Sequence, residues 1–169
     1  TFFKGYLRLI AAMDESIGRV LDHLDASGLA ENTLVVYTSD NGFFLGDHGL
    51  YNKMWMYEES LGLPLLMRLP GVIAPGRVRN ELASILDFAP TFLELAGAPV
   101  PEDLQGRSLL PLLRTQSPPS DWRDGHYYHY YGQFGVPSHC GIRTETHKLI
   151  WFYEAADPDE EWELFDLET

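Results

Sequence analysis

The first 38 residues constrain the fold most, because they place a long amphipathic helix directly before a strand. Apolar side chains recur at helical spacing from Tyr6 to Leu24 and form one face of a helix. Gly28 suits the C-terminal cap of that helix. Residues 33–38 are almost all β-prone, which is typical of a buried strand. This order predicts an α/β fold in which helices flank a sheet.

Two later segments continue the pattern. Residues 63–69 indicate the next strand, with Pro64 near its start because proline cannot donate to a strand ladder. Apolar residues recur at helical spacing from Ile85 to Ala96, and Gly97 ends them. Asp87 near the start of this second helix offers either a cap or an acid in the first turn.

The residue pattern changes after a stretch rich in proline and hydroxyl residues at 115–120. We therefore predict two parts, residues 1–114 and residues 115–169. The second part contains short alternating or aromatic segments, which predict a small antiparallel sheet. Those segments are residues 126–131, 141–153 and 162–167.

Two features of the second part have simple expected roles. Its aromatic cluster, which we expect to pack the small sheet although aromatic rings also stack on sugars, consists of Tyr127, Tyr128, Tyr130, Tyr131 and Phe134. Residues 157–161 are mostly acidic and are expected to form a solvated turn.

Charge and composition exclude several classes of partner. The 169 residues contain 12 Lys and Arg against 25 Asp and Glu, a net charge of -13. A general attraction to nucleic acid or to an anionic membrane is therefore excluded, and an anionic ligand would need local cations. We expect neither a membrane span nor a signal peptide, since residues 1–29 show helical periodicity with acids. Cys140 is the single cysteine, so no internal disulfide is possible, and cysteine usage does not indicate an oxidising or a reducing compartment.

The polar loop at residues 39–53 follows the first predicted strand. Asp40 and Asn41 lie at the carboxyl end of that strand, where ligands bind in open α/β sheets. Their carboxylate and amide oxygens are the ligand type that calcium or magnesium prefers. The same Asp-Asn-Gly sequence is also a common turn, because Asn and Gly tolerate positive φ.

Two further side chains of the loop suit anion chemistry. Lys53 could offer a point charge to a sulfate or phosphate oxygen, although a single lysine is usually solvated surface. His48 could donate to a leaving-group oxygen or orient a carboxylate, although a loop histidine often makes only a structural hydrogen bond. A cation site beside an anion site suggests hydrolysis of an anionic ester.

A further pattern is the order and spacing of short segments along the chain, at residues 13–21, 38–42, 45–50, 53, 57–60, 64–66, 87–91, 106–109, 141–144, 148–150 and 163–167. Taken in order, these segments resemble the type I sulfatases of the alkaline phosphatase superfamily. The resemblance covers essentially the whole chain, and it is specific for the family but not for the substrate. It implies part of an alkaline-phosphatase-like sheet with flanking helices, followed by a small C-terminal antiparallel β subdomain.

The resemblance also implies roles for individual residues. Asp40 and Asn41 match two ligands of the active-site Ca²⁺, and Lys53 matches the catalytic lysine that binds the sulfate group. His48 and His139 are substrate-binding candidates. In the family, an arginine usually stands at the position of Gly62, so an ion pair or a contact to the loop acids is in doubt here.

The nucleophile of such sulfatases is a formylglycine hydrate, which is made from Cys or Ser in a Cys/Ser-x-Pro/Ala-x-Arg motif. This motif is absent, because Cys140 is followed by Gly141-Ile142-Arg143 and Ser117 has no arginine at the required spacing. The chain also begins inside helical sequence and stops straight after a strand-like segment. We therefore expect a piece of a larger protein, whose N-terminal half supplies the formylglycine and the remaining ligands, and we expect the piece alone to be inactive.

The expected function is hydrolysis of sulfate esters on a carbohydrate or a small molecule. One alternative is a phosphonate or phosphodiester hydrolase of the same superfamily; such relatives tend to have Asp-His at the position of Asp40-Asn41 and prefer a transition metal. Another alternative is a non-catalytic module that binds sulfated glycans. The resemblance implies a periplasmic or extracellular location.

Overall fold

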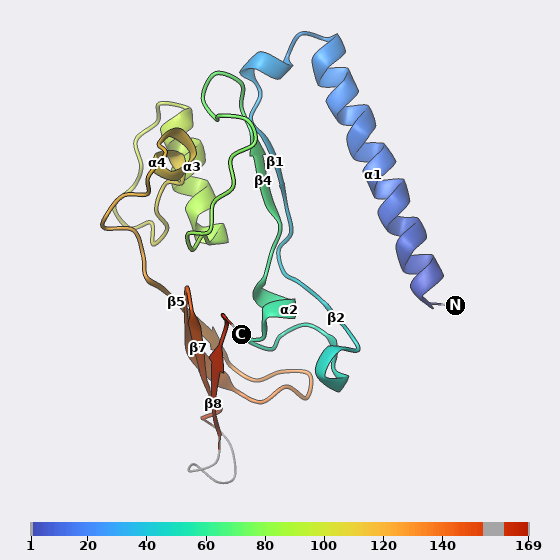
Figure 1. Ribbon diagram of the computed structural model, residues 1–169, viewed down its shortest axis with the longest axis vertical. Coiled ribbons are helices and arrows are strands. Elements are labelled where there is room, and N and C mark those ends of the chain that lie inside the picture. Colours follow the sequence, from blue (N-terminus) through green and yellow to red (C-terminus); the bar gives the residue numbers. More distant parts are fainter. Residues whose placement is uncertain (1, 154–160, 169) are drawn as a thin grey trace. The chain divides into compact units, whose positions relative to one another are not determined.

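The computed structural model describes residues 2–153 and 161–168 (Figure 1). These residues form two compact units, one of residues 1–37 and 66–76 and the other of residues 38–65 and 77–169. The predicted boundary between residues 114 and 115 lies inside the second unit and stays a prediction about domain organisation.

The first unit contains the long N-terminal helix, α1 (Phe2–Ala26), as its apolar periodicity predicts. Gly28 follows the helix with φ at 70°, which is the left-handed conformation of a C-terminal cap. After a short 3-10 helix, β1 (Val35–Thr38) pairs with β4 (Leu65–Arg68) in a two-stranded sheet. β1 is half-buried at all four positions and not fully buried as its β-prone sequence predicts. Among the described helices, none is long and apolar enough to cross a membrane.

The loop after β1 is more regular than the sequence predicts. It forms a small hairpin, in which β2 (Phe44–Leu45) pairs antiparallel with β3 (Tyr51–Asn52) across a 3-10 turn at Asp47–Gly49. Phe44 anchors the hairpin, because its side chain is completely buried. The one-turn helix α2 (Glu58–Leu61) follows and leads into β4.

The second predicted helix begins with a 3-10 turn at Ile85–Asp87 and continues as α3 (Phe88–Leu95). Ser84 and Asp87 form a capping box, in which Asp87 is the acid of the 3-10 turn; Asp87 is also the N-cap position of α3, where its side chain makes no capping hydrogen bond. Asp87 is completely buried and also pairs with Arg123. The short helix α4 (Leu110–Arg114) comes next.

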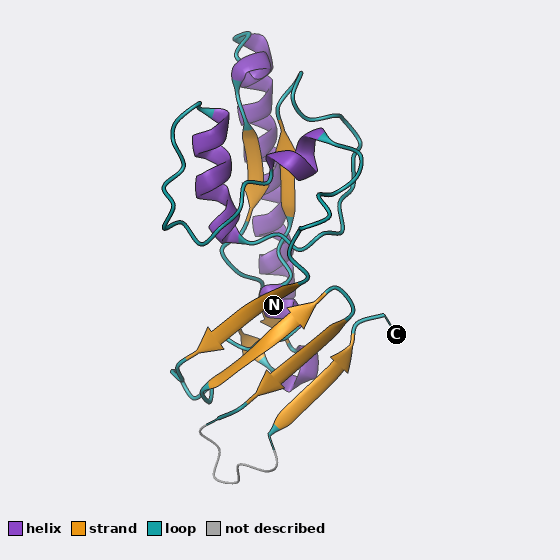
Figure 2. Ribbon diagram, turned by 90° about the vertical axis from the view of Figure 1, so that its left-hand side faces the viewer, coloured by secondary structure: helices purple, strands orange, loops and turns teal. Residues whose placement is uncertain are grey.

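The predicted small antiparallel sheet is confirmed. Its order is β5 (Gly125–Tyr130), β6 (His139–Thr144), β7 (His147–Trp151) and β8 (Trp162–Asp166), with each pair antiparallel (Figure 2). Of the predicted acidic turn, residues 157–160 lie outside the described residues.

The two faces of this sheet differ in burial. Ile150 and Phe152 pack with Met56 into a core cluster, and Tyr128 packs against it. The opposite face is open in the described residues, and its large exposed apolar side chains are Tyr127, Ile142, Trp151, Trp162 and Leu164. The aromatic cluster is therefore divided by the strand alternation, and only part of it packs the sheet as expected.

Candidate active site

The backbone at Asn41 and Gly42 is held against α2. The N–H of Gly42 donates to the carbonyl of Ser60 at 2.8 Å. A side chain at Gly42 would collide with the backbone carbonyl of Glu59, so glycine is required by this close approach. The position of Asn41 is therefore tied to the position of α2.

The hairpin brings Lys53 back to the residues that follow β1. Its turn uses left-handed backbone at Gly46, His48 and Gly49, with φ of 122°, 55° and 72°. Asn52 and Met54, on either side of Lys53, both have φ at 84°, which is uncommon for residues with a side chain. Such strained backbone clusters at functional sites and persists only when its surroundings hold it.

Three of the five predicted site residues meet in this way. The Lys53 Nζ donates to Asn41 Oδ1 at 2.6 Å and lies 3.9 Å from Asp40 Oδ2. The Asn41 amide is oriented by its Nδ2, which donates to the Gly42 carbonyl at 2.8 Å. Lys53 and Asn41 lie twelve residues apart in sequence, and the hairpin closes that distance.

This group of charges is open to solvent. The Asp40 side chain is 83% exposed and the Lys53 side chain 41%, so their ion pair is screened and adds little to stability. The oxygens of Asp40 and Asn41 are directed at one positive group, the Lys53 ammonium. That arrangement fits a site that accepts positive charge, and its donors are the hard oxygens that calcium prefers.

The fit to calcium is partial within this chain. Calcium takes about six to eight oxygen ligands, and Asp40 and Asn41 would supply two of them. Over residues 2–153 and 161–168, no group of three or more His, Cys, Asp or Glu side chains could hold a metal ion.

His48 lies in the same hairpin and is held by a carboxylate. Its Nε2 lies 3.0 Å from Glu59 Oε1, and its ring is 5.5 Å from the ring of Tyr57. A carboxylate at one ring nitrogen fixes the orientation of an imidazole and leaves the other nitrogen, Nδ1, for proton exchange. The sequence did not indicate Glu59 as its partner.

His139 lies elsewhere, within the aromatic core. It is completely buried, its Nδ1 lies 2.8 Å from the Pro137 carbonyl, and its Nε2 has no hydrogen-bond partner within the part of the chain that the structure describes. Burial lowers the pKa of this imidazole below its ordinary value. Its ring stacks on Trp55, at 6.2 Å between centroids, and Trp55 is two residues from Lys53. The predicted substrate-binding role of His139 stays a prediction.

An ion group at α2 was missed by sequence reasoning. Glu58 pairs with Lys148, and its Oε2 lies 3.2 Å from the Arg143 guanidinium. Burial would raise the pKa of Glu58, but the hydrogen bonds from Lys148 and Arg143 outweigh it and lower that pKa. Burial also lowers the pKa of Lys148, and Glu58 opposes that shift. These three residues lie in segments that carry the family resemblance, which is the one signal that pointed to them.

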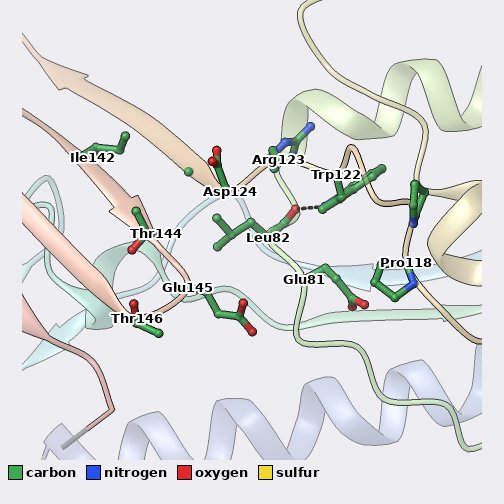
Figure 3. Close-up of a pocket in the computed structure, with 12 residues that line it drawn as sticks. Glu81, Leu82, Pro118, Trp122, Arg123, Asp124, Ile142, Thr144, Glu145 and Thr146 are labelled. Carbon is green, nitrogen blue, oxygen red and sulfur yellow. Dashed lines mark hydrogen bonds between the residues drawn. The ribbon is translucent and has the colours of Figure 1, made fainter.

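A separate cavity of about 540 Å³ lies in the second unit (Figure 3). Its lining includes Leu82, Trp122 and Ile142, with the carboxylates of Glu81 and Glu145 at its edge. The Trp122 indole donates to the Leu82 carbonyl at 2.9 Å, which links two of the lining residues. None of the predicted site residues is among its described lining residues, so the candidate site is the hairpin.

Comparison with known proteins gives consistent results. Residues 46–169 match the family model described as N-sulphoglucosamine sulphohydrolase, C-terminal. An N-acetylglucosamine-6-O-sulfatase of Bacteroides thetaiotaomicron is 46% identical over 172 residues, which cover 99% of this chain and 30% of that protein. The chain thus spans about a third of the length of this curated relative.

Solved structures give the same fold. A protein solved in complex with its substrate, D-glucosamine-2-N,6-O-disulfate, matches with a TM-score of 0.87 and 46% identity, over 94% of this chain and 32% of that chain. A phosphonate monoester hydrolase from Silicibacter pomeroyi matches with a TM-score of 0.78 and 31% identity, over 92% of this chain and 33% of that chain. The fold alone therefore does not separate sulfate esters from phosphonate esters.

Proposed function

The chain belongs to the sulfatase family of the alkaline phosphatase superfamily, and on that premise we propose that it is the C-terminal part of an enzyme that hydrolyses sulfate esters. The observation that supports this most is the position of the Lys53 ammonium, 2.6 Å from Asn41 Oδ1 and beside Asp40. One cation and two hard oxygens lie together in a chain of net charge -13. An anionic substrate needs such a local cation, because the overall field repels it.

In this proposal Lys53 binds a non-bridging oxygen of the sulfate group. Its ammonium is a compact charge on a flexible stem, so it can turn from Asn41 to the substrate. Negative charge develops on these oxygens in the transition state, and its neutralisation is the largest single contribution to the rate that we expect from the residues of this chain. Asp40 and Asn41 would hold Ca²⁺ in part, and a bound Ca²⁺ supplies Lewis-acid polarisation of the sulfate oxygens.

His48 is proposed as the residue on the leaving-group side. Glu59 holds its Nε2 at 3.0 Å, so Nδ1 is the atom that would donate a proton to the departing alcohol oxygen. The nucleophile, formylglycine in this family, and the other metal ligands would come from residues outside this chain.

We propose a sulfated amino sugar, free or within a glycan, as the substrate. Support comes from the relative that is named as an N-acetylglucosamine-6-O-sulfatase and from the structure solved with a disulfated glucosamine. A polymeric sulfated glycan is too large and too charged to cross a membrane unaided. We therefore also propose a periplasmic or extracellular location, which cell fractionation would test.

The test uses the full-length enzyme with two substrates, a 6-O-sulfated N-acetylglucosamine and a chromogenic aryl sulfate. We expect Asp40→Ala to lose bound calcium and activity together. Lys53→Ala should lower kcat by about 100- to 1,000-fold, the usual cost of one charge-stabilising donor. Lys4→Ala, which changes a lysine of α1, is the control and should have no effect. An unchanged kcat/KM in Lys53→Ala would show that Lys53 does not bind sulfate.

A phosphonate monoester hydrolase is the second candidate, because such an enzyme shares the fold at 31% identity. Metal analysis and a phenyl phosphonate assay on the full-length protein separate the two. Calcium with sulfate turnover supports the sulfatase, whereas zinc or manganese with phosphonate turnover supports the alternative. The 169-residue chain alone should hydrolyse neither ester, because it lacks the nucleophile motif.

A further inference from the structure

Three consecutive residues of α2 contact three different parts of the second unit. The side chain of Glu58 binds Lys148 and Arg143 of the C-terminal sheet. The side chain of Glu59 binds His48, and the carbonyl of Ser60 accepts from Gly42, next to Asn41. One helical turn therefore connects the C-terminal sheet both to the backbone beside Asn41 and to His48.

The contact to the sheet is buried at its Lys148 end, whereas the Glu58 side chain is 42% exposed. The Lys148 side chain is 2% exposed and lies on β7, an inner strand of the sheet, between its cross-strand neighbours Arg143 and Phe165. A charged amine in such a place is very costly unless a carboxylate and hydrogen bonds compensate it. The Lys148 ammonium therefore fixes the position of the Glu58 carboxylate, whose other oxygen pairs with Arg143.

The turn that follows Glu58 is rigid enough to transmit this placement. The N–H of Leu61 donates to the Tyr57 carbonyl at 3.0 Å, and the N–H of Gly62 donates to the Glu58 carbonyl at 2.6 Å. Gly42 has no space for even one added carbon against the carbonyl of Glu59. A shift of α2 would therefore move the backbone beside Asn41 and the carboxylate that holds His48.

We infer that Lys148 and Arg143 are positioning residues for the active site and act through Glu58. The C-terminal sheet thereby sets the geometry of the Asp40–Asn41 oxygens and of His48, although none of its side chains needs to touch the substrate. Buried ion pairs are often replaceable by apolar residues without loss of stability, so this one is better explained by orientation than by stability. The inference rests on the proposed function for its kinetic readout, but its structural readout does not.

The experiment compares variants of the full-length protein by hydrogen exchange and by kinetics. Glu58→Gln/Lys148→Met removes the charges of Glu58 and Lys148, while the Arg143 guanidinium, 25% exposed, keeps its hydrogen bond to the Thr144 carbonyl. Arg143→Met is a milder second variant, because it leaves Glu58 paired with Lys148. Arg107→Met breaks an exposed ion pair with Asp121 in the same unit and serves as the matched control.

We expect the double variant to remain folded and to exchange the Gly42 amide at least tenfold faster, with the amides of β7 unchanged. Its kcat/KM should fall by about 10- to 100-fold, as for other residues that support metal or catalytic side chains. Arg143→Met should change both quantities in the same direction by less, and Arg107→Met should change neither.

The inference is overturned if a folded variant retains the wild-type exchange rate at Gly42, or if exchange rises equally across β7 and Gly42, which is the result of a merely stabilising role. If the double variant fails to fold, Arg143→Met decides by the same criteria. If the wild-type protein hydrolyses no sulfate ester, the proposed function fails while the exchange of Gly42 still decides this inference.

Discussion

Replacing Asp87 by alanine tests whether a buried carboxylate organises the second unit between α3 and the segment before β5. Asp87 is completely buried and accepts from the backbone N–H of Ser84 and of Arg107, each at 2.8 Å. Its two oxygens also accept from the two terminal nitrogens of Arg123, each at 2.5 Å. Asp87→Ala removes all four of these acceptor contacts together.

The expected loss in the free energy of unfolding follows from the Arg123 guanidinium, which remains after Asp87 is removed. The Arg123 side chain is 20% exposed, so its guanidinium would be left largely buried without a carboxylate. Removing one partner of a buried pair costs about 3–5 kcal/mol. The free energy of unfolding should therefore fall by about 4 kcal/mol, most of it from the uncompensated Arg123.

Urea unfolding followed by tryptophan fluorescence is a suitable assay, because one of the four tryptophans, Trp122, has its ring centroid 5.3 Å from the Arg123 Cζ. Arg123→Met should restore part of the loss when it is added to Asp87→Ala, since it removes the uncompensated charge. Asp121→Ala is the control; its side chain is 76% exposed, and we expect no measurable change. A loss below about 1 kcal/mol for Asp87→Ala, or strict additivity in the double variant, would refute this reasoning.

Two further predictions concern pH and packing. Burial lowers the pKa of His139 from its ordinary value near 6.5, so the unfolded chain binds that proton more readily. The contribution of His139 to the free energy of unfolding should be full above pH 6.5 and fall as the pH drops below it. His139→Phe should remove part of this loss of stability, as measured by urea titrations at several pH values. The remaining loss should come from His126, because burial lowers its pKa as well. Gly42→Ala should cost about 1–3 kcal/mol in thermal unfolding, because its new methyl group meets the Glu59 carbonyl. Gly18→Ala, with open space around it on α1, should cost nothing, and equal effects of the two changes would contradict this.

Much of the fold could be predicted from the sequence, because its elements are set by local periodicity. The pattern from Tyr6 to Leu24 predicts α1, and strand alternation after residue 120 predicts the antiparallel sheet. The small hairpin around His48 was not predicted, since its strands are two residues long and its turn depends on backbone conformations that no periodicity encodes.

The candidate site was predictable in part for the same reason. Asp40 and Asn41 follow a recognisable strand, so their place could be reasoned from the sequence. That Lys53 reaches Asn41 depends on the hairpin; the chemistry of lysine suggested an anion-binding role, and the family resemblance made that role specific. Glu59 and Lys148 were missed because their partners are eleven and ninety residues away along the chain, and pairings at such separations leave no local pattern.

The three contacts of α2 have a consequence for how this sequence can vary in length. Successive side chains of a helix point about 100° apart, so the directions of Glu58 and Glu59 depend on their consecutive numbering, and the position of the Ser60 carbonyl depends on its height along the helix axis. A single inserted or deleted residue in this turn would rotate at least one contact away from its partner. Gaps between homologous sequences should therefore fall outside residues 57–61, in the longer connections such as residues 69–84.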